Sequence, residues 1–133
     1  MADNKYFYAL GRRKSATARV RVLGGKGSFK INDKDAADYF DGSKQMYTEL
    51  MRPFTVLELD PEKYVVSAKV AGGGHASQVD AIRLGVAKAL IEMNEEFRGT
   101  LRKAELLGRD SRERERKKFG LRGARKQRQF TKR

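Results

Sequence analysis

The last 26 residues, 108–133, are too strongly charged to join a folded core, and this limits what the chain can fold into. They hold twelve Lys or Arg residues against three acidic ones, in a chain of 133 residues with a net charge of +13. Compact packing does not relieve such repulsion, whereas binding to a polyanion does, and nucleic acids are the abundant polyanions. We therefore predict a globular body over residues 1–107 and a basic, extended C-terminal tail over residues 108–133.

A solvated tail with no partner is the simple alternative for any basic run. Here Phe119-Gly120-Leu121 and Phe130 interrupt the charges, which a plain solubility tail does not need. The acid-first pairs Asp110/Arg114 and Glu113/Lys117 favour a helical turn or two before Gly120. Beyond Gly120 we expect extended chain docked on nucleic acid.

Several function classes find little support in the composition. The chain has no cysteine and a single histidine, so the sequence predicts no disulfide, no metal site and no catalytic cysteine. No apolar run approaches the roughly 20 residues that cross a bilayer, and the N-terminus lacks the layout of a signal peptide. We expect a cytoplasmic protein that is not an enzyme, carries no cofactor and has no membrane partner.

The strand signals predict an α+β body with a mostly antiparallel sheet and helices packed on one face. In residues 16–23 small apolar residues alternate with Thr17, Arg19 and Arg21, which is typical of a half-buried strand. The glycines after this strand predict a hairpin to residues 28–31. The strands are predicted at residues 6–10, 16–23, 28–31, 54–59 and 64–71.

Helical spacing appears in four places. Apolar residues at 36–40 predict a short helix, with Asn32-Asp33 as its cap or as a turn, and Ser43 caps a second helix that Pro53 ends. The strongest helix follows the glycines at 72–74, with Ser77 and Asp80 as a capping box and Asn94 as its end. A last helix places Phe97, Leu101 and Ala104 on its inner face.

One basic cluster lies within the body. It comprises Arg12, Arg13 and Lys14, followed by Arg19 and Arg21, and no acidic residue occurs between Asp3 and Asp33. Arg19 and Arg21 lie ~6.6–6.8 Å apart on one strand face, close to the phosphate repeat of a nucleic acid, and Arg13 joins that face if the strand begins early. The guanidinium fork suits phosphate. A solvated strand face is the alternative.

Three glycines precede the strongest helix, at Gly72-Gly73-Gly74-His75. Such a loop accepts an anion at a helix N-terminus, but it matches neither a dinucleotide fingerprint nor a Walker sequence. An RNA phosphate or a plain tight turn is favoured over a nucleotide cofactor. Most aromatic residues occupy core-like positions, so a stacking platform for single strands is not expected.

Several motifs, in this order along the chain, resemble those of the small-subunit ribosomal protein S nine family. They are Gly11-Arg12-Arg13-Lys14-Ser15-Ala16, Ala18-Arg19-Val20, Gly72-Gly73-Gly74, Ala81-Ile82-Arg83, Ala87-Lys88-Ala89-Leu90, Arg109-Asp110-Ser111-Arg112, Glu115-Arg116-Lys117-Lys118, Ala124-Arg125-Lys126 and Gln129-Phe130-Thr131-Lys132-Arg133. Each motif alone is weak, but the ordered set is specific and covers nearly the whole chain.

The resemblance implies a structural protein in the head of the small ribosomal subunit. The family's body has the fold named after the second domain of ribosomal protein S five, with a left-handed β-α-β crossover. Its partners are small-subunit ribosomal RNA, neighbouring head proteins and the transfer RNA in the peptidyl site. The ribosomal RNA contacts that follow are Arg12, Arg13, Lys14, Arg19, Arg21, Gly73, Gly74, Arg109, Arg112, Arg116, Lys117, Lys118, Arg122, Arg125 and Lys126. The transfer RNA contacts are Lys132 and Arg133, with Arg128 a weaker candidate.

Two other function classes stay open at this point. The superfamily fold resembles that of small-molecule kinases with a glycine-rich phosphate loop, although this chain offers no evident base or magnesium carboxylates. A DNA-architectural protein or RNA chaperone outside the ribosome also fits the charge. Comparable affinity for duplex DNA distinguishes that class from a ribosomal protein.

Overall fold

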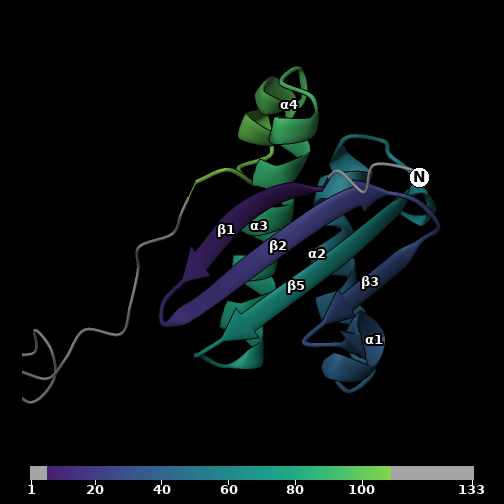
Figure 1. Cartoon of the computed structure of the whole chain (residues 1–133). Coiled ribbons are helices and arrows are strands. Elements are labelled where there is room, and N and C mark those ends of the chain that lie inside the picture. The colour runs from purple at the N-terminus through teal and green to yellow at the C-terminus, as the bar shows by residue number, and fades with distance from the viewer. Residues whose placement is uncertain (1–5, 109–133) are drawn as a thin grey trace, which may run out of the picture.

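The computed structural model describes residues 6–108, which form one five-stranded sheet and a layer of helices (Figure 1). The elements in chain order are β1 (Phe7–Arg13), β2 (Ala16–Gly24), β3 (Ser28–Ile31), β4 (Lys34–Asp35), α1 (Ala36–Tyr39), α2 (Lys44–Val56), the 3₁₀ turn η1 (Pro61–Lys63), β5 (Tyr64–Ala71), α3 (His75–Met93) and α4 (Phe97–Lys103). The α+β class is confirmed for these residues.

The sheet is mixed, with strand order β1-β2-β5-β3-β4. Three neighbouring pairs are antiparallel, and β3 pairs with β5 in parallel. The predicted hairpin between β2 and β3 is therefore wrong, because β5 inserts between them. Gly25 N–H donates to the Lys63 carbonyl at 3.0 Å, which ties the β2–β3 connection to the start of β5.

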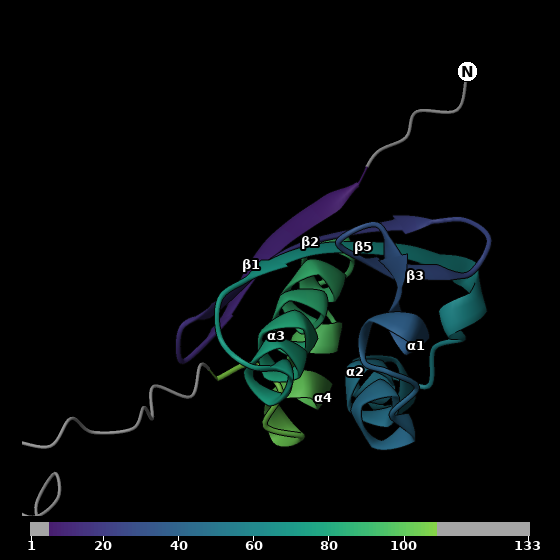
Figure 2. The same cartoon turned by 90° about the horizontal axis from the view of Figure 1, so that it is seen from below.

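The helices α1, α2, α3 and α4 cover one face of the sheet (Figure 2). The core lies between the two layers and includes the small inward residues of β2, of which Ala18, Val20 and Val22 are fully buried. The predicted alternation of β2 and β5 is confirmed. In the described residues no helix covers the opposite face, so the sheet has one packed and one open side.

β1 crosses α3 at a distance that only glycine permits. A Cβ atom on Gly11 would lie 1.7 Å from the Ala81 carbonyl oxygen, and one on Gly85 would lie 2.5 Å from a Val20 methyl group. The prediction that the first strand stops at residue 10, before Gly11, is wrong, because β1 continues to Arg13. The glycine is present for close packing, and the strand runs on past it.

The predicted strand at 54–59 is also wrong, because α2 passes through Pro53 and ends at Val56. Leu50, Pro53 and Phe54 are buried on one side of this helix, and that burial outweighs the loss of one backbone hydrogen bond at the proline. The Ser43 cap is confirmed, since its side chain accepts from the Met46 N–H at 3.4 Å.

The ends of the remaining helices differ in part from the prediction. α3 begins at His75 with Gly74 as its N-cap, so the Ser77–Asp80 capping box is wrong, whereas the end at Asn94 is confirmed. Asn32 and Asp33 form the turn into the short strand β4, which the sequence reading missed. In α4, Leu101 is fully buried, as predicted for its inner face.

Candidate nucleic-acid interface

The open side of the sheet carries cations and no acid along its three longest strands. We call it the outer sheet face, and it comprises the outward residues of β1, β2 and β5. These are Tyr8, Leu10, Arg12, Thr17, Arg19, Arg21, Leu23, Val65, Ser67, Lys69 and Ala71. The register sets Arg19 opposite Lys69, so positive charges stand side by side across β2 and β5.

The cations of the outer sheet face form no ion pair with an acidic side chain in the described part of the chain. Among residues 6–108, no ion pair involves Arg12, Arg19, Arg21 or Lys69. All four side chains are exposed. Adjacent like charges of this kind raise the local positive potential and attract an anionic ligand.

Arg13 lies on the other side of the sheet, contrary to the prediction that it joins Arg19 and Arg21. Alternation along β1 turns it toward the helices, where its Nε lies 3.4 Å from Asp80 Oδ2. Asp80 also binds Arg83 at 3.2 Å, and Arg83 pairs with Glu49 of α2. Arg13 therefore joins a network of ion pairs that ties β1 to α3 and α2.

The tip of the β1–β2 hairpin meets the glycine turn before α3. Lys14 and Ser15 form the two-residue tip, and Lys14 has a φ of 53°. Gly72 and Gly73 have φ values of 79° and 68°, and a Cβ on Gly72 would lie 2.4 Å from the Ser15 carbonyl oxygen. These two glycines are thus required by the turn itself. A Cβ on Gly74, the N-cap, would meet no atom within 4 Å, so the turn leaves the backbone at the start of α3 open.

The sequence reading missed an aromatic component of the outer sheet face. Tyr6 and Tyr8 are 48% and 44% exposed, and both line a hollow of about 440 Å³ with Arg19, Arg21 and Lys69. The Arg21 guanidinium stacks 4.9 Å from the centre of the Tyr6 ring. The outward position of Tyr8 in the alternation of β1 could have revealed it, but most aromatic residues were interpreted as core-like and residues 6–10 were predicted only as a strand.

The body ends close to this basic region. Gly108 lines a small hollow together with Arg12 and Arg13, so the described chain stops beside β1 (Figure 1). The remaining predicted contacts lie outside the described residues. They are Arg109, Arg112, Arg116, Lys117, Lys118, Arg122, Arg125, Lys126, Arg128, Lys132 and Arg133.

His75 packs at the C-terminal end of α1. Its ring lies 5.8 Å from that of Tyr39 and 5.4 Å from that of Phe40.

In the described part of the chain, no three His, Cys, Asp or Glu side chains gather as a metal site would require. Within the same range no helix is long and apolar enough to span a membrane.

Comparison with known proteins gives a consistent result. A family model described as "Ribosomal protein S9/S16" matches residues 11–133. The "Small ribosomal subunit protein uS9" of Ureaplasma urealyticum serovar 10 is 50% identical over 127 residues, covering 96% of this chain and 94% of the relative. The protein of the same name from Ureaplasma parvum serovar 3 is 49% identical with the same coverage.

Proposed function

The chain belongs to the ribosomal protein S9/S16 family, as a structural component of the small ribosomal subunit, and from this we propose which of its surfaces bind which RNA. The outer sheet face and the hairpin tip dock on ribosomal RNA of the subunit head. The C-terminal tail continues along that RNA and reaches the transfer RNA in the peptidyl site. The protein works on the cytoplasmic ribosome, without catalysis and beside other head proteins.

The observation that carries the ribosomal RNA contact is the row of cations without acids on the outer sheet face. Arg12, Arg19 and Arg21 are exposed there, and no acidic side chain among the described residues forms an ion pair with them. Contacts of this type read phosphate and fix orientation, and they carry no base specificity. Lys14 at the hairpin tip and the N-terminus of α3 behind Gly73 and Gly74 extend the same surface.

Arg13 is part of the proposal in a different role. Its ion pair with Asp80 holds the end of β1 against α3, which fixes the direction of Arg12 and Lys14. We therefore keep Arg13 among the RNA-site residues as one that positions the hairpin tip.

The tail carries the larger charge, and its role in the proposal follows from the sequence. Eight basic residues after position 116, with no acid among them, favour continuous phosphate contact. The body ends at Gly108 beside Arg12, so ribosomal RNA on the outer sheet face leads directly to the tail. Its last two residues, Lys132 and Arg133, hold the peptidyl-site transfer RNA by charge, with Arg128 as a weaker contact.

The crossover between the parallel strands β3 and β5 is proposed to be left-handed, as the family resemblance implies. β3 and β5 run in the same direction, and their connection passes through α1 and α2 on the helical face (Figures 1 and 2). This layout supports the left hand, against the general preference for right-handed connections.

Sedimentation of a native lysate tests the proposal first. In magnesium and moderate salt, the protein is expected to migrate with small subunits and whole ribosomes, and nuclease treatment is expected to release it. A protein that stays at the top of the gradient would contradict the assignment to the ribosome. Equal affinity for duplex DNA would point instead to an architectural DNA-binding protein.

A further inference from the structure

We propose that the tyrosines of the outer sheet face form a stacking platform for unpaired RNA bases. The inference rests on the proposed ribosomal RNA contact and specifies the RNA that this face accepts. The platform consists of Tyr6 and Tyr8, with Arg19, Arg21 and Lys69 around the hollow that both rings line. It takes single-stranded nucleotides, held by ring stacking and by phosphate contacts.

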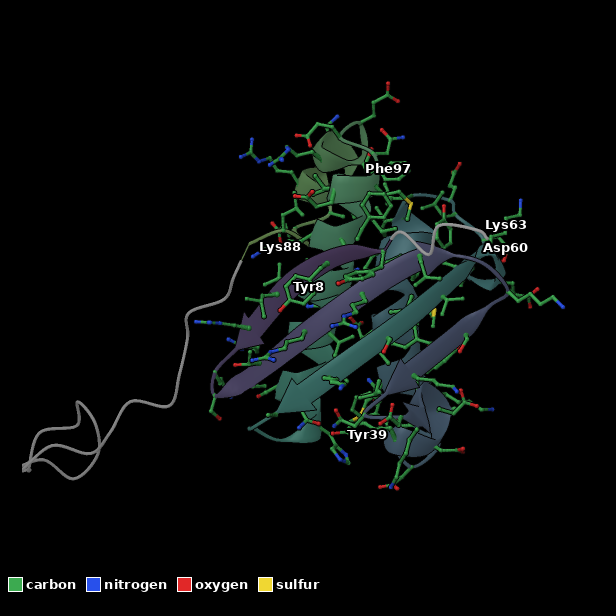
Figure 3. All side chains as sticks on the ribbon, viewed as in Figure 1. Tyr8, Tyr39, Asp60, Lys63, Lys88 and Phe97 are labelled. Carbon is green, nitrogen blue, oxygen red and sulfur yellow. The ribbon has the colours of Figure 1, made fainter. Side chains whose placement is uncertain are left out.

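The first argument is the position of the exposed apolar side chains. In residues 6–108 four large hydrophobic residues are exposed, and three of them, Tyr6, Tyr8 and Leu10, occur in or just before β1. Figure 3 shows Tyr8 over the sheet on the side away from the helices. Large apolar groups gathered on one open face indicate a binding surface, whereas scattered ones do not.

The second argument is the chemistry around the rings. Arg21 stacks on Tyr6, and Arg19 and Lys69 lie across β2 and β5 from each other. An acidic protein partner would match only the positive charge of this surface. A single RNA strand matches both the charge and the aromatic rings. Its bases stack on aromatic rings and its phosphates meet arginine and lysine.

The third argument is spacing. Tyr8 lies on β1 and Tyr6 directly precedes it, and two positions in extended chain are separated by about 6.8 Å. That distance is close to twice the ~3.4 Å that separates successive nucleotides of one strand along the helix axis, which is shorter than the phosphate repeat along the backbone. Paired bases inside a duplex are covered by their neighbours, so rings placed in this way select unpaired nucleotides.

Binding of the full-length protein to RNA tests the platform. The probes are a labelled oligouridylate of about ten nucleotides, within the site size of single-strand binders, and an RNA duplex of equal length. Tyr8→Ala is expected to weaken oligouridylate binding roughly 5- to 150-fold and to leave duplex binding and the salt dependence unchanged. Tyr8→Phe keeps the ring and is expected to bind as the native protein does.

Tyr47→Ala is the matched control, because Tyr47 is 42% exposed on α2, on the helical side of the sheet. It is expected to leave both affinities unchanged. If Tyr8→Ala fails to fold, Tyr6→Ala replaces it, since Tyr6 precedes β1 and makes no strand pairing.

Two results would overturn the platform. One is that Tyr8→Ala leaves the affinity for oligouridylate unchanged. If that variant instead weakens the binding of a neighbouring protein to isolated subunits, Tyr8 is a protein contact and the platform is also overturned. The other is an equal loss for single strand and duplex, which would mean that charge alone binds both. Neither result affects the sedimentation test, so failure of the platform and failure of the ribosomal RNA proposal are distinguishable.

Discussion

Arg12 and Arg13 are adjacent in the sequence, yet they belong to regions of the molecule with opposite properties. Arg12 is exposed on the outer sheet face, where no acid pairs with it among the described residues. Arg13 faces the helices, and its side chain is 15% exposed in an ion pair with Asp80. The same residue type is thus proposed to bind RNA on one face of the sheet, and it joins β1 to α3 through an ion pair on the other.

The two faces also differ in how much change they tolerate. On the packed face, Gly11 and Gly85 leave no space for a single methyl group, so the helix position is fixed there. On the open face, side chains extend into solvent and make few contacts with the protein. Substitutions on the packed face should therefore change stability, and substitutions on the open face should change RNA affinity.

The largest effect is expected for Gly11→Ala on the packed face. The new Cβ would lie 1.7 Å from the Ala81 carbonyl oxygen, and because both partners are backbone, strand or helix must move. We expect the free energy of unfolding to fall by roughly 3 kcal/mol or more, at the upper end of overpacking effects. Urea unfolding measures it.

Gly24→Ala is the control for Gly11→Ala, because a Cβ at Gly24 meets no atom within 4 Å. Its free energy of unfolding should change by less than about 0.5 kcal/mol. If both variants lost the same free energy of unfolding, the loss would come from replacing a glycine in a strand and not from the contact of the new Cβ with α3.

The second prediction compares the tail with the outer sheet face as a source of RNA affinity. Deleting residues 119–133 removes six basic side chains, and if about six phosphate contacts are lost, the slope of log affinity against log salt falls by roughly four. Filter binding over a salt series measures the slope. The free energy of unfolding should not change, because the proposed body ends at residue 107. An unchanged slope would place the electrostatic binding in the sheet face instead.

The third prediction separates the two adjacent arginines. Arg13→Met removes one partner from the Asp80 network and should lower the free energy of unfolding by about 1–2 kcal/mol, since Asp80 keeps Arg83. Arg12→Met should change that free energy by less than about 0.5 kcal/mol and reduce the salt slope by roughly 0.7. Urea unfolding and salt titration of both variants measure these changes. A loss of stability in Arg12→Met together with a lower salt slope in Arg13→Met would contradict the assignment of binding to the open face and stability to the packed face.

The sequence predicted those parts of the fold that depend on local patterns. The alternation in β2 and β5 and the long apolar helix α3 are properties of consecutive residues, and they were read correctly. The order of the strands was not, because nothing in residues 24–31 shows that β5 separates β3 from β2. In α2, the spacing of Leu50, Pro53 and Phe54 was helical, but Pro53 was given more weight than the burial it gains.

The same limit applies to the candidate site. Charge is visible in a sequence, so Arg12, Arg13, Lys14, Arg19 and Arg21 were predicted to form one basic cluster. Whether Arg12 or Arg13 faces outward depends on where the alternation of β1 begins. The pairing of β1 with β2 from Phe7 to Arg13 determines this, and the sequence alone does not show it. Tyr6 and Tyr8 were missed because the residue type alone does not show whether an aromatic side chain is buried in the core or exposed to solvent.

A local effect is expected at the end of the tail, and it tests whether the tail has two functions or one. Lys132 and Arg133 are the last two residues and are proposed to contact peptidyl-site transfer RNA. Two lost contacts correspond to a decrease of roughly 1.4 in the salt slope, which is small beside the decrease from the longer deletion. Lys132→Gln with Arg133→Gln removes the charge without shortening the chain, so it separates charge from length. Subunit assembly should proceed normally both in this double variant and after deletion of Lys132 and Arg133, while transfer RNA dissociates faster from the peptidyl site in each. Defective assembly would instead make the terminal pair part of the ribosomal RNA contact, and the tail would then act as one continuous phosphate-binding segment.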